Sequence, residues 1–321
     1  RFKNSCLLAT ELSGISKHDE CLLYGLRKQA EEGDNYTPTP WLFNNPGGHR
    51  GSSDDSPLFY DAGMRVVLVP VVMGFPTSSL PQCWTGLNTY DFSYVQSAIE
   101  AQLQRTPNAK VILYASISPW FKEFGDNYSN AVWTDGQGRK VGVKTWHSTI
   151  YYDSIPDDAV WVPSYTAEDF RREVSSALTA LANNLNTFSA GKAVIGLHMI
   201  GGNDGQWFPP VSTRGFDYSP GAQASFREYL TSLYGTNAAL QVAWNDPYVT
   251  LATATLAIDA ERATSDLFLD PQNGHQRKVI DSNRFASVGL AQTLERFAAT
   301  FKSALGRNVL VSTYYPDIFA G

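Results

Sequence analysis

The sequence predicts an α/β protein, a TIM-type (β/α)8 barrel that is complete or incomplete within this chain. Three observations lead to this fold class. Apolar, β-branched runs alternate with helical patterns, the strongest runs are apolar on both faces as in buried parallel strands, and long polar connections follow the strands. The chain has 321 residues, which suits one barrel-sized domain.

Residues 1–37 show no clear pattern and are expected to form an N-terminal extension, with one glycosidase-like barrel domain over 38–321. Five strands are expected in that domain. They cover residues 41–44, 65–72, 110–117, 193–200 and 309–315. A closed barrel needs eight strands, so either C-terminal strands are missing from this chain or further strands lie where the pattern predicts loop.

Helices are expected between these strands, and their ends are marked by capping residues. Residues 91–104 carry one apolar stripe behind Asp91, an N-cap residue type. A capping-box pattern at Thr166 starts the next helix, and Ser219-Pro220 starts a third. Residues 281–305 form the fourth, with Gly306 as its cap. Residues 122–165 are expected to be a long functional loop.

The segment 194–208 carries the strongest functional signal. A buried strand runs into a Gly-rich turn that holds Asn203, Asp204, Gln206 and Trp207. Barrel enzymes place their reactive groups at the carboxyl ends of strands. An indole offers a flat apolar face to a sugar ring, and amide and carboxyl groups hydrogen-bond its hydroxyls. The segment therefore predicts a carbohydrate site.

The net charge argues against nucleic acid as a partner and leaves a neutral carbohydrate open. The net charge is −6 and the pI about 5.4, whereas nucleic-acid binding needs a basic stripe. The sequence has no apolar run long enough to predict a membrane helix. It also has no phosphate loop and no metal-ligand cluster, so no cofactor or metal is expected. Cys6 and Cys21 could form one disulfide, which would leave Cys83 free and without a His partner. Location stays open, with an extracellular address favoured.

Several motifs appear in order along the chain. They are Ser118-Pro119-Trp120 after a strand, Phe226-Arg227 in a helix, Tyr234-Gly235-Thr236, Ala243-Trp244-Asn245, and Asp281 followed by Arg284-Phe285. In this order they resemble glycoside hydrolase family 42 and its relatives among the β-galactosidase-like barrels of clan A. The resemblance covers residues 40 to 321. Such enzymes often form dimers or trimers, so it also implies a homo-oligomer.

The resemblance implies a retaining β-glycosidase that uses one carboxylic acid and one carboxylate nucleophile. One alignment puts Gln206 at the acid position, and the other puts Asp204 there. Because an amide cannot give up a proton, Gln206 would impair catalysis. The nucleophile belongs on a seventh strand that the sequence does not show, and on the fragment interpretation it lies beyond residue 321. The alternative is a non-catalytic carbohydrate-binding or structural pseudoenzyme.

Other candidate substrate contacts follow or lie within the expected strands, and each has a structural alternative. For His198, a satisfied core histidine is the better explanation, whereas the polar turn around Trp207 favours a site role over core packing. For the other aromatic residues, packing competes evenly with sugar stacking. The full set of binding candidates is Asn203, Trp207, Arg50, Asn44, Trp120, His198, Tyr314 and Tyr315.

Overall fold

The computed structural model describes residues 60–74, 80–144, 150–201, 207, 216–263 and 269–314. Its centre is a four-stranded sheet in the order β1-β4-β8-β9, and every strand pair is parallel. The strands are β1 (Val66–Val72), β4 (Lys110–Ser116), β8 (Val194–Ile200) and β9 (Leu310–Thr313). Four expected strands are therefore confirmed, and the fifth, 41–44, lies outside the described residues.

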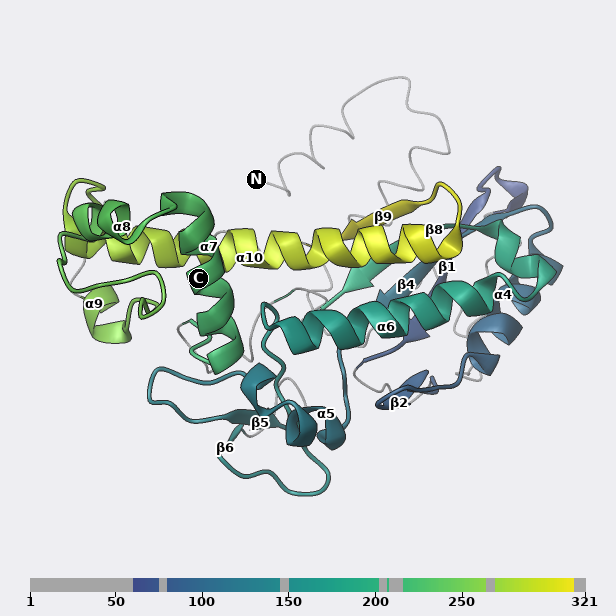
Figure 1. The fold of residues 1–321 in the computed structure, drawn as a ribbon. Helices are drawn as coiled ribbons and strands as arrows, with labels where there is room; N and C mark the ends of the chain where they lie inside the picture. Colours follow the sequence, from purple (N-terminus) through teal and green to yellow (C-terminus); the bar gives the residue numbers. More distant parts are fainter. Residues whose placement is uncertain are drawn as a thin grey trace, which may run out of the picture.

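The two faces of this sheet differ in their environment. In β4, Leu113 and Ala115 are buried while Tyr114 and Ser116 are half-buried. The long helices α6 (Glu168–Leu185) and α10 (Gly274–Leu305) run side by side in front of the sheet in Figure 1, and their apolar side chains join the buried face in one core. The opposite face, which would line the interior of a barrel, is the more exposed one. Among the described residues the sheet stays open, which matches part of a barrel.

The helices start near the predicted positions, but not all of them use the predicted caps. The N-cap residue of α6 is Ala167, with no side-chain cap, so the capping box expected at Thr166 is absent. Helix α4 covers Ser93–Arg105. Helix α7 (Pro220–Tyr234) begins after Ser219, whose Oγ accepts a hydrogen bond from Ala222 N, and ends at Gly235 with φ of 71°. Helix α8 (Asn237–Trp244) follows, and α9 covers Asp259–Ala263.

Helix α10 starts seven residues before the predicted Asp281. Asn273 caps it, because its Oδ1 accepts hydrogen bonds from the backbone N–H groups of His275 and Gln276. The apolar stripe of the helix becomes strong only later, at Phe285 and beyond. The stripe therefore predicted the buried part of the helix and missed its polar first turns.

The prediction of a long loop over 122–165 was wrong in part. This connection holds α5 (Lys122–Asn127), η1 (Ser129–Ala131) and a small antiparallel sheet in the order β6-β5-β7. Strand β5 covers Val141–Val143, β6 covers Ile150–Tyr152 and β7 covers Val160–Trp161. Strands of two or three residues are too short to show a period of two, so the pattern did not reveal them. The hairpin β2 (Trp84–Gly86) and β3 (Thr89–Tyr90) and the short η2 (Ser189–Ala193) were missed for the same reason.

The apolar side chains form two cores that share α10. The larger lies between the sheet, α6 and the C-terminal half of α10. The smaller lies between α7, α8 and the N-terminal half of α10, around Phe226 and Phe285. In Figure 1 the helices α7, α8 and α9 gather at one end of α10, away from β9. Within the described residues, no helix is long and apolar enough to cross a membrane.

Candidate functional site

The carboxyl ends of all four parallel strands meet at one edge of the sheet. Here Gly74 follows β1, Ser118 follows β4, Gly201 follows β8 and Tyr314 follows β9. The strand ends lie close together: Ile117 N donates to the carbonyl at the end of β8 over 3.0 Å, and Gly74 N donates to a side-chain oxygen of β4 over 3.3 Å. The candidate residues at the ends of β4, β8 and β9 thus come from neighbouring strands.

Trp207 is the one described residue of the predicted site turn, and it is buried. Only 2% of the residue is exposed. Its ring packs edge-on against Tyr165 at 5.6 Å and at a tilt of 45° against Phe297 of α10 at 6.4 Å. Its Nε1–H donates a hydrogen bond to Thr313 Oγ1 over 2.7 Å. In this position the ring contributes to the core, and a sugar would have to displace its neighbours to stack on it. The predicted stacking role of Trp207 therefore has no support in its packing.

His198 lies in β8 on the more exposed face of the sheet, within a cluster of aromatic rings. Its ring stacks on Tyr114 of β4 at 5.3 Å and meets Tyr314 edge-on at 4.6 Å. Its Nδ1 shares a hydrogen bond of 2.9 Å with Ser312 Oγ of β9. Burial lowers the pKa of His198, so the ring is neutral near pH 7.

The other described candidates differ in exposure. Tyr314 is 46% exposed and lies beside His198, so it has a free aromatic surface. Trp120 is half-buried after β4, and its carbonyl accepts a long hydrogen bond of 3.3 Å from Gln82 Nε2. Both residues lie at the carboxyl edge, as expected from the ends of their strands.

Six of the predicted site residues lie outside the described residues, as do the expected N-terminal extension and the Cys6–Cys21 pair. These positions are Asn44, Arg50, Asn203, Asp204, Gln206 and Tyr315. Their roles stay predictions.

Tyr114, Ser312 and Thr313 contact His198 or Trp207, although no motif in the sequence marked them as site residues. The signal was present in part. In three adjacent parallel strands, Tyr114, His198 and Ser312 are register partners, and an alternating side-chain pattern puts them on one face. Tyr114 and His198 lie 84 positions apart in the sequence, and His198 and Ser312 lie 114 apart. The register between such distant strands could not be derived from the sequence alone.

Cys83 has the properties of a structural thiol. It is fully buried, and burial together with the charge of Asp91 raises its pKa to about 12. A thiol with such a pKa stays protonated at neutral pH and is a poor nucleophile. Among the described residues no group of His, Cys, Asp and Glu could hold a metal ion.

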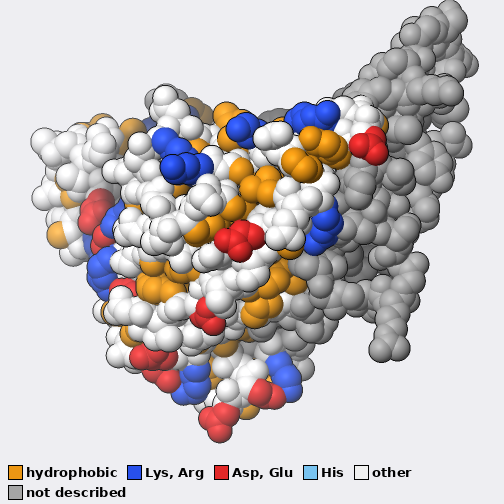
Figure 2. Space-filling model, turned by 90° about the vertical axis from the view of Figure 1, so that its right-hand side faces the viewer, with side chains coloured by type: hydrophobic (Ala, Val, Ile, Leu, Met, Phe, Trp, Pro, Cys, Tyr) orange, Lys and Arg blue, Asp and Glu red, His pale blue; other side chains and the backbone are white. Residues whose placement is uncertain are grey.

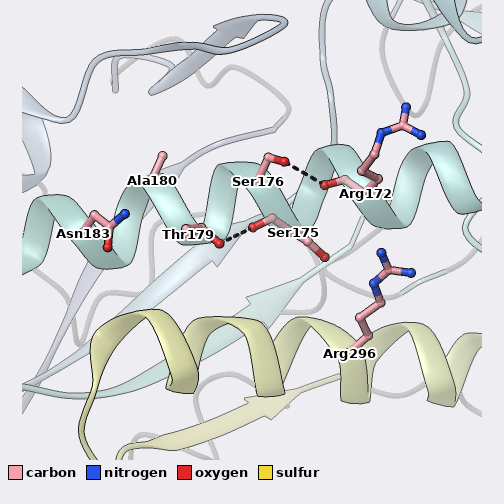
Figure 3. Close-up of a pocket in the computed structure, with 7 residues that line it drawn as sticks. All are labelled: Arg172, Ser175, Ser176, Thr179, Ala180, Asn183 and Arg296. Atoms are coloured by element: carbon pink, nitrogen blue, oxygen red, sulfur yellow. Dashed lines mark hydrogen bonds between the residues drawn. The ribbon is translucent and has the colours of Figure 1, made fainter.

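A separate groove of about 400 Å³ lies on the outer surface between α6 and α10 (Figure 3). Its two arginines are engaged: Arg172 pairs with Asp169 over 2.7 Å, and Arg296 pairs with Glu168 over 2.7 Å. Small side chains of α6 complete its lining, and two of their hydroxyls donate to carbonyls within their own helix. Its two arginines and two of its hydroxyls are thus paired, whereas Ser175 Oγ is buried without a partner among the described residues.

Charged side chains of both signs are scattered among apolar ones on the face drawn in Figure 2. On the described residues of that face they form no continuous basic stripe.

No protein family and no curated protein matches the chain by sequence. Its fold is similar to solved β-galactosidases. The enzyme of the psychrophilic Marinomonas ef1 is 16% identical with a TM-score of 0.51, over 80% of this chain and 34% of that one. The enzyme of Bacillus circulans sp. alkalophilus is 16% identical with a TM-score of 0.53, over 85% and 35%. That of the Antarctic haloarchaeon Halorubrum lacusprofundi is 15% identical with a TM-score of 0.52, over 80% and 33%.

This likeness confirms the predicted resemblance to family 42 and related β-galactosidases at the level of the fold. The chain spans about one third of the length of these enzymes. It therefore has the fold of part of a glycoside hydrolase barrel.

Proposed function

We propose that this chain forms the sugar-binding part of a retaining glycoside hydrolase that acts on β-linked, galactoside-type sugars, with its proton transfer impaired at Gln206. One combination supports the proposal. The chain shares its fold with β-galactosidases, and the turn after β8, where barrel enzymes place reactive groups, carries Gly205-Gln206-Trp207 in place of a Gly-Glu-Trp sequence.

The chemistry of the acid position explains the expected impairment. A retaining glycosidase protonates the leaving oxygen with a carboxylic acid, and such general acid catalysis contributes roughly 100- to 10,000-fold in rate. The amide of Gln206 keeps the shape and hydrogen bonds of a Glu but has no proton to transfer. If Asp204 holds the position instead, the acid is present on a side chain one methylene shorter.

The described aromatic residues suggest how a sugar would be held. We assign the stacking surface to Tyr314, which is 46% exposed, because Trp207 is buried. Trp120 lies at the same edge of the sheet and forms a second candidate surface. His198 Nε2 at the same edge is buried and has no hydrogen-bond partner among the described residues.

The nucleophile is not assigned to any residue of this chain. Retention requires a carboxylate about 5–5.5 Å from the acid, and the family pattern places it on a later strand of the barrel. Hydrolysis therefore depends on that group as well as on position 206.

The second candidate function is a non-catalytic carbohydrate-binding or structural protein. The amide at position 206 favours it, because Gln retains binding contacts while removing the proton donor. Both candidates predict sugar binding, and they differ in turnover.

An aryl β-galactoside with a good leaving group separates the two candidates, because its departure needs little acid assistance. If the chain is an impaired hydrolase, it cleaves p-nitrophenyl β-galactoside but not lactose, and Gln206→Glu raises lactose turnover by 100-fold or more. Asp204→Asn is the matched control, because it tests the other alignment with an equally small change. Because the nucleophile is assigned to no residue of this chain, the test uses the complete natural protein. Binding of both sugars without turnover there, even for Gln206→Glu, would instead establish the non-catalytic function.

A further inference from the structure

We infer that Ser312 and His198 are positioning residues for the sugar-stacking surface: the hydroxyl of Ser312 fixes the imidazole of His198, and the imidazole supports the ring of Tyr314 from one side. This inference rests on the proposed function, which assigns the stacking surface to Tyr314. It stands on contacts between described residues in or next to the adjacent strands β4, β8 and β9.

Two contacts determine the orientation of the His198 ring. The ring lies almost parallel to that of Tyr114, with an interplanar angle of 6° and 5.3 Å between the ring centroids, so stacking sets the plane of the imidazole. Its Nδ1 shares a hydrogen bond of 2.9 Å with Ser312 Oγ, which sets the direction of the ring within that plane. Because Nε2 has no hydrogen-bond partner among the described residues, this direction depends on the Ser312 hydroxyl.

The register of the strands brings Tyr314 to the same imidazole. Ser312 of β9 is the register partner of His198 in β8, and Tyr314 comes two residues after Ser312, at the carboxyl end of β9. From there its ring reaches across to β8 and meets the imidazole edge-on, with 4.6 Å between the ring centroids and an interplanar angle of 77°. Edge-to-face contacts of this kind stabilise aromatic pairs, so the position of the tyrosine ring depends on that of the imidazole.

The consequence for sugar binding follows from the exposure of Tyr314. The contact with His198 supports its ring while 46% of the residue stays exposed. A ring that is held in place before binding offers its face to a sugar without a further loss of side-chain freedom, whereas a mobile ring has to be ordered when the sugar binds. Without the Ser312 hydroxyl the imidazole and then the tyrosine ring gain freedom. We therefore expect sugar affinity to fall roughly two- to tenfold.

The test compares Ser312→Ala, which removes the hydroxyl, with Ser312→Thr, which keeps it, in the complete natural protein. Ser312 is exposed, so both changes leave the apolar core intact. The probe is isopropyl β-thiogalactoside, whose sulfur linkage resists hydrolysis. Ser312→Ala should weaken its binding roughly two- to tenfold, and Ser312→Thr should not. Ser97→Ala is the matched control, since this exposed serine donates its hydroxyl to the carbonyl of Ser93 within α4, and it should leave affinity unchanged.

A double-mutant cycle separates positioning from direct contact with the sugar. Tyr314→Leu removes the aromatic ring itself. If Ser312 acts through that ring, Ser312→Ala causes no further loss of affinity in the Tyr314→Leu protein. An equal loss in both backgrounds would mean that Ser312 contacts the sugar directly. That result would overturn the inference, as would affinity unchanged by Ser312→Ala.

The nuclear Overhauser effect between the two rings gives a readout without any sugar. In protein that carries protons only on its His and Tyr rings, the wild type should show a cross-peak between His198 and Tyr314, assigned by its loss in Tyr314→Leu. The cross-peak should weaken in Ser312→Ala and persist in Ser312→Thr. If the wild type binds no thiogalactoside, the proposed function fails, while this comparison still decides whether Ser312 fixes the pair of rings. Equal cross-peaks in wild type and Ser312→Ala would overturn the inference in either case.

Discussion

His198 shows how the environment of a single residue determines its charge. The ring lies between Tyr114 and Tyr314, and burial holds its pKa below the ordinary value of 6.5. As the pH falls through 6.5, the unfolded chain therefore takes up a proton before the folded chain does. The stability that the neutral ring contributes is fully present above pH 6.5 and is lost as the pH decreases below that value.

This difference gives a testable pH dependence. We expect the urea midpoint of the wild type to fall between pH 7.5 and pH 5.5, and His198→Gln, which cannot be protonated, to show a smaller decrease. Tyr248→Phe is a suitable control, because that ring is 89% exposed. Equal decreases in the wild type and in His198→Gln would show that the ring does not titrate differently in the folded state.

The same residue shows what the sequence could tell about the site. Its position within an apolar run correctly placed it in a strand, and the satisfied-core interpretation agrees in part with its half-buried ring and its bond to Ser312. For Trp207, a polar sequence context suggested an exposed sugar surface. Its burial depends on Tyr165, Phe297 and Thr313, which are distant in sequence. Local polarity says little about contacts of that kind.

At the scale of elements, the motifs that resemble family 42 meet at one buried carboxylate. Asp281 of α10 is fully buried. Its Oδ2 accepts hydrogen bonds from Tyr234 Oη of α7 over 2.6 Å and from Trp244 Nε1 of α8 over 2.8 Å, and its Oδ1 accepts one from Arg277 Nε over 3.1 Å. The Tyr-Gly-Thr, Trp and Asp motifs therefore join three helices, which gives them a structural role.

Removal of this carboxylate should destabilise the helical end of the molecule strongly. Asp281→Ala leaves the two buried donors and Arg277 without their acceptor, so we expect a loss of about 3 kcal/mol in the free energy of unfolding. Asp281→Asn keeps one acceptor oxygen and should lose less. Urea unfolding of the two variants measures the difference, and an alanine variant as stable as the wild type would exclude the structural role.

The elements also differ in how well the sequence predicted them. Strands β1, β4, β8 and β9 were found to within one or two residues, because seven- or four-residue apolar runs stand out from their polar flanks. The strands β5, β6 and β7 were missed because each has only two or three residues. Their pairing is fixed by tertiary contacts: Val141 pairs with Tyr152, and Val143 pairs with both Ile150 and Val160.

At the scale of the whole molecule, the strands β1, β4, β8 and β9 form an open parallel sheet whose second face would be the interior of a barrel. The fold class was therefore predicted correctly at the level of an α/β parallel sheet, and the number of strands needed for closure could not be read from the sequence. Leu310 of the edge strand β9 is 67% exposed. Such an edge is where a further strand of a barrel would pair.

Helix α10 connects the two apolar cores, and this arrangement predicts that they unfold together. Val279 and Phe285 of α10 belong to the smaller core, and Phe297 and Phe301 belong to the larger one. Loss of packing in either core removes support from the same continuous helix. Phe226→Ala in the smaller core and Phe297→Ala in the larger should each cost about 3–5 kcal/mol, because both rings are fully buried.

Amide hydrogen exchange distinguishes shared from separate unfolding. Peptides from α8 report on the smaller core, and peptides from α6 report on the larger one. If α10 couples the cores, Phe226→Ala in the smaller core speeds the slowest amide exchange in α6 as well as in α8. Phe297→Ala in the larger core then also speeds the slowest exchange in both helices. Faster exchange confined to the mutated core would mean that the two halves of α10 unfold separately, with the boundary between Phe285 and Leu290. The barrel-like part would then be stable without the helical end, and the motifs around Asp281 would serve that end alone.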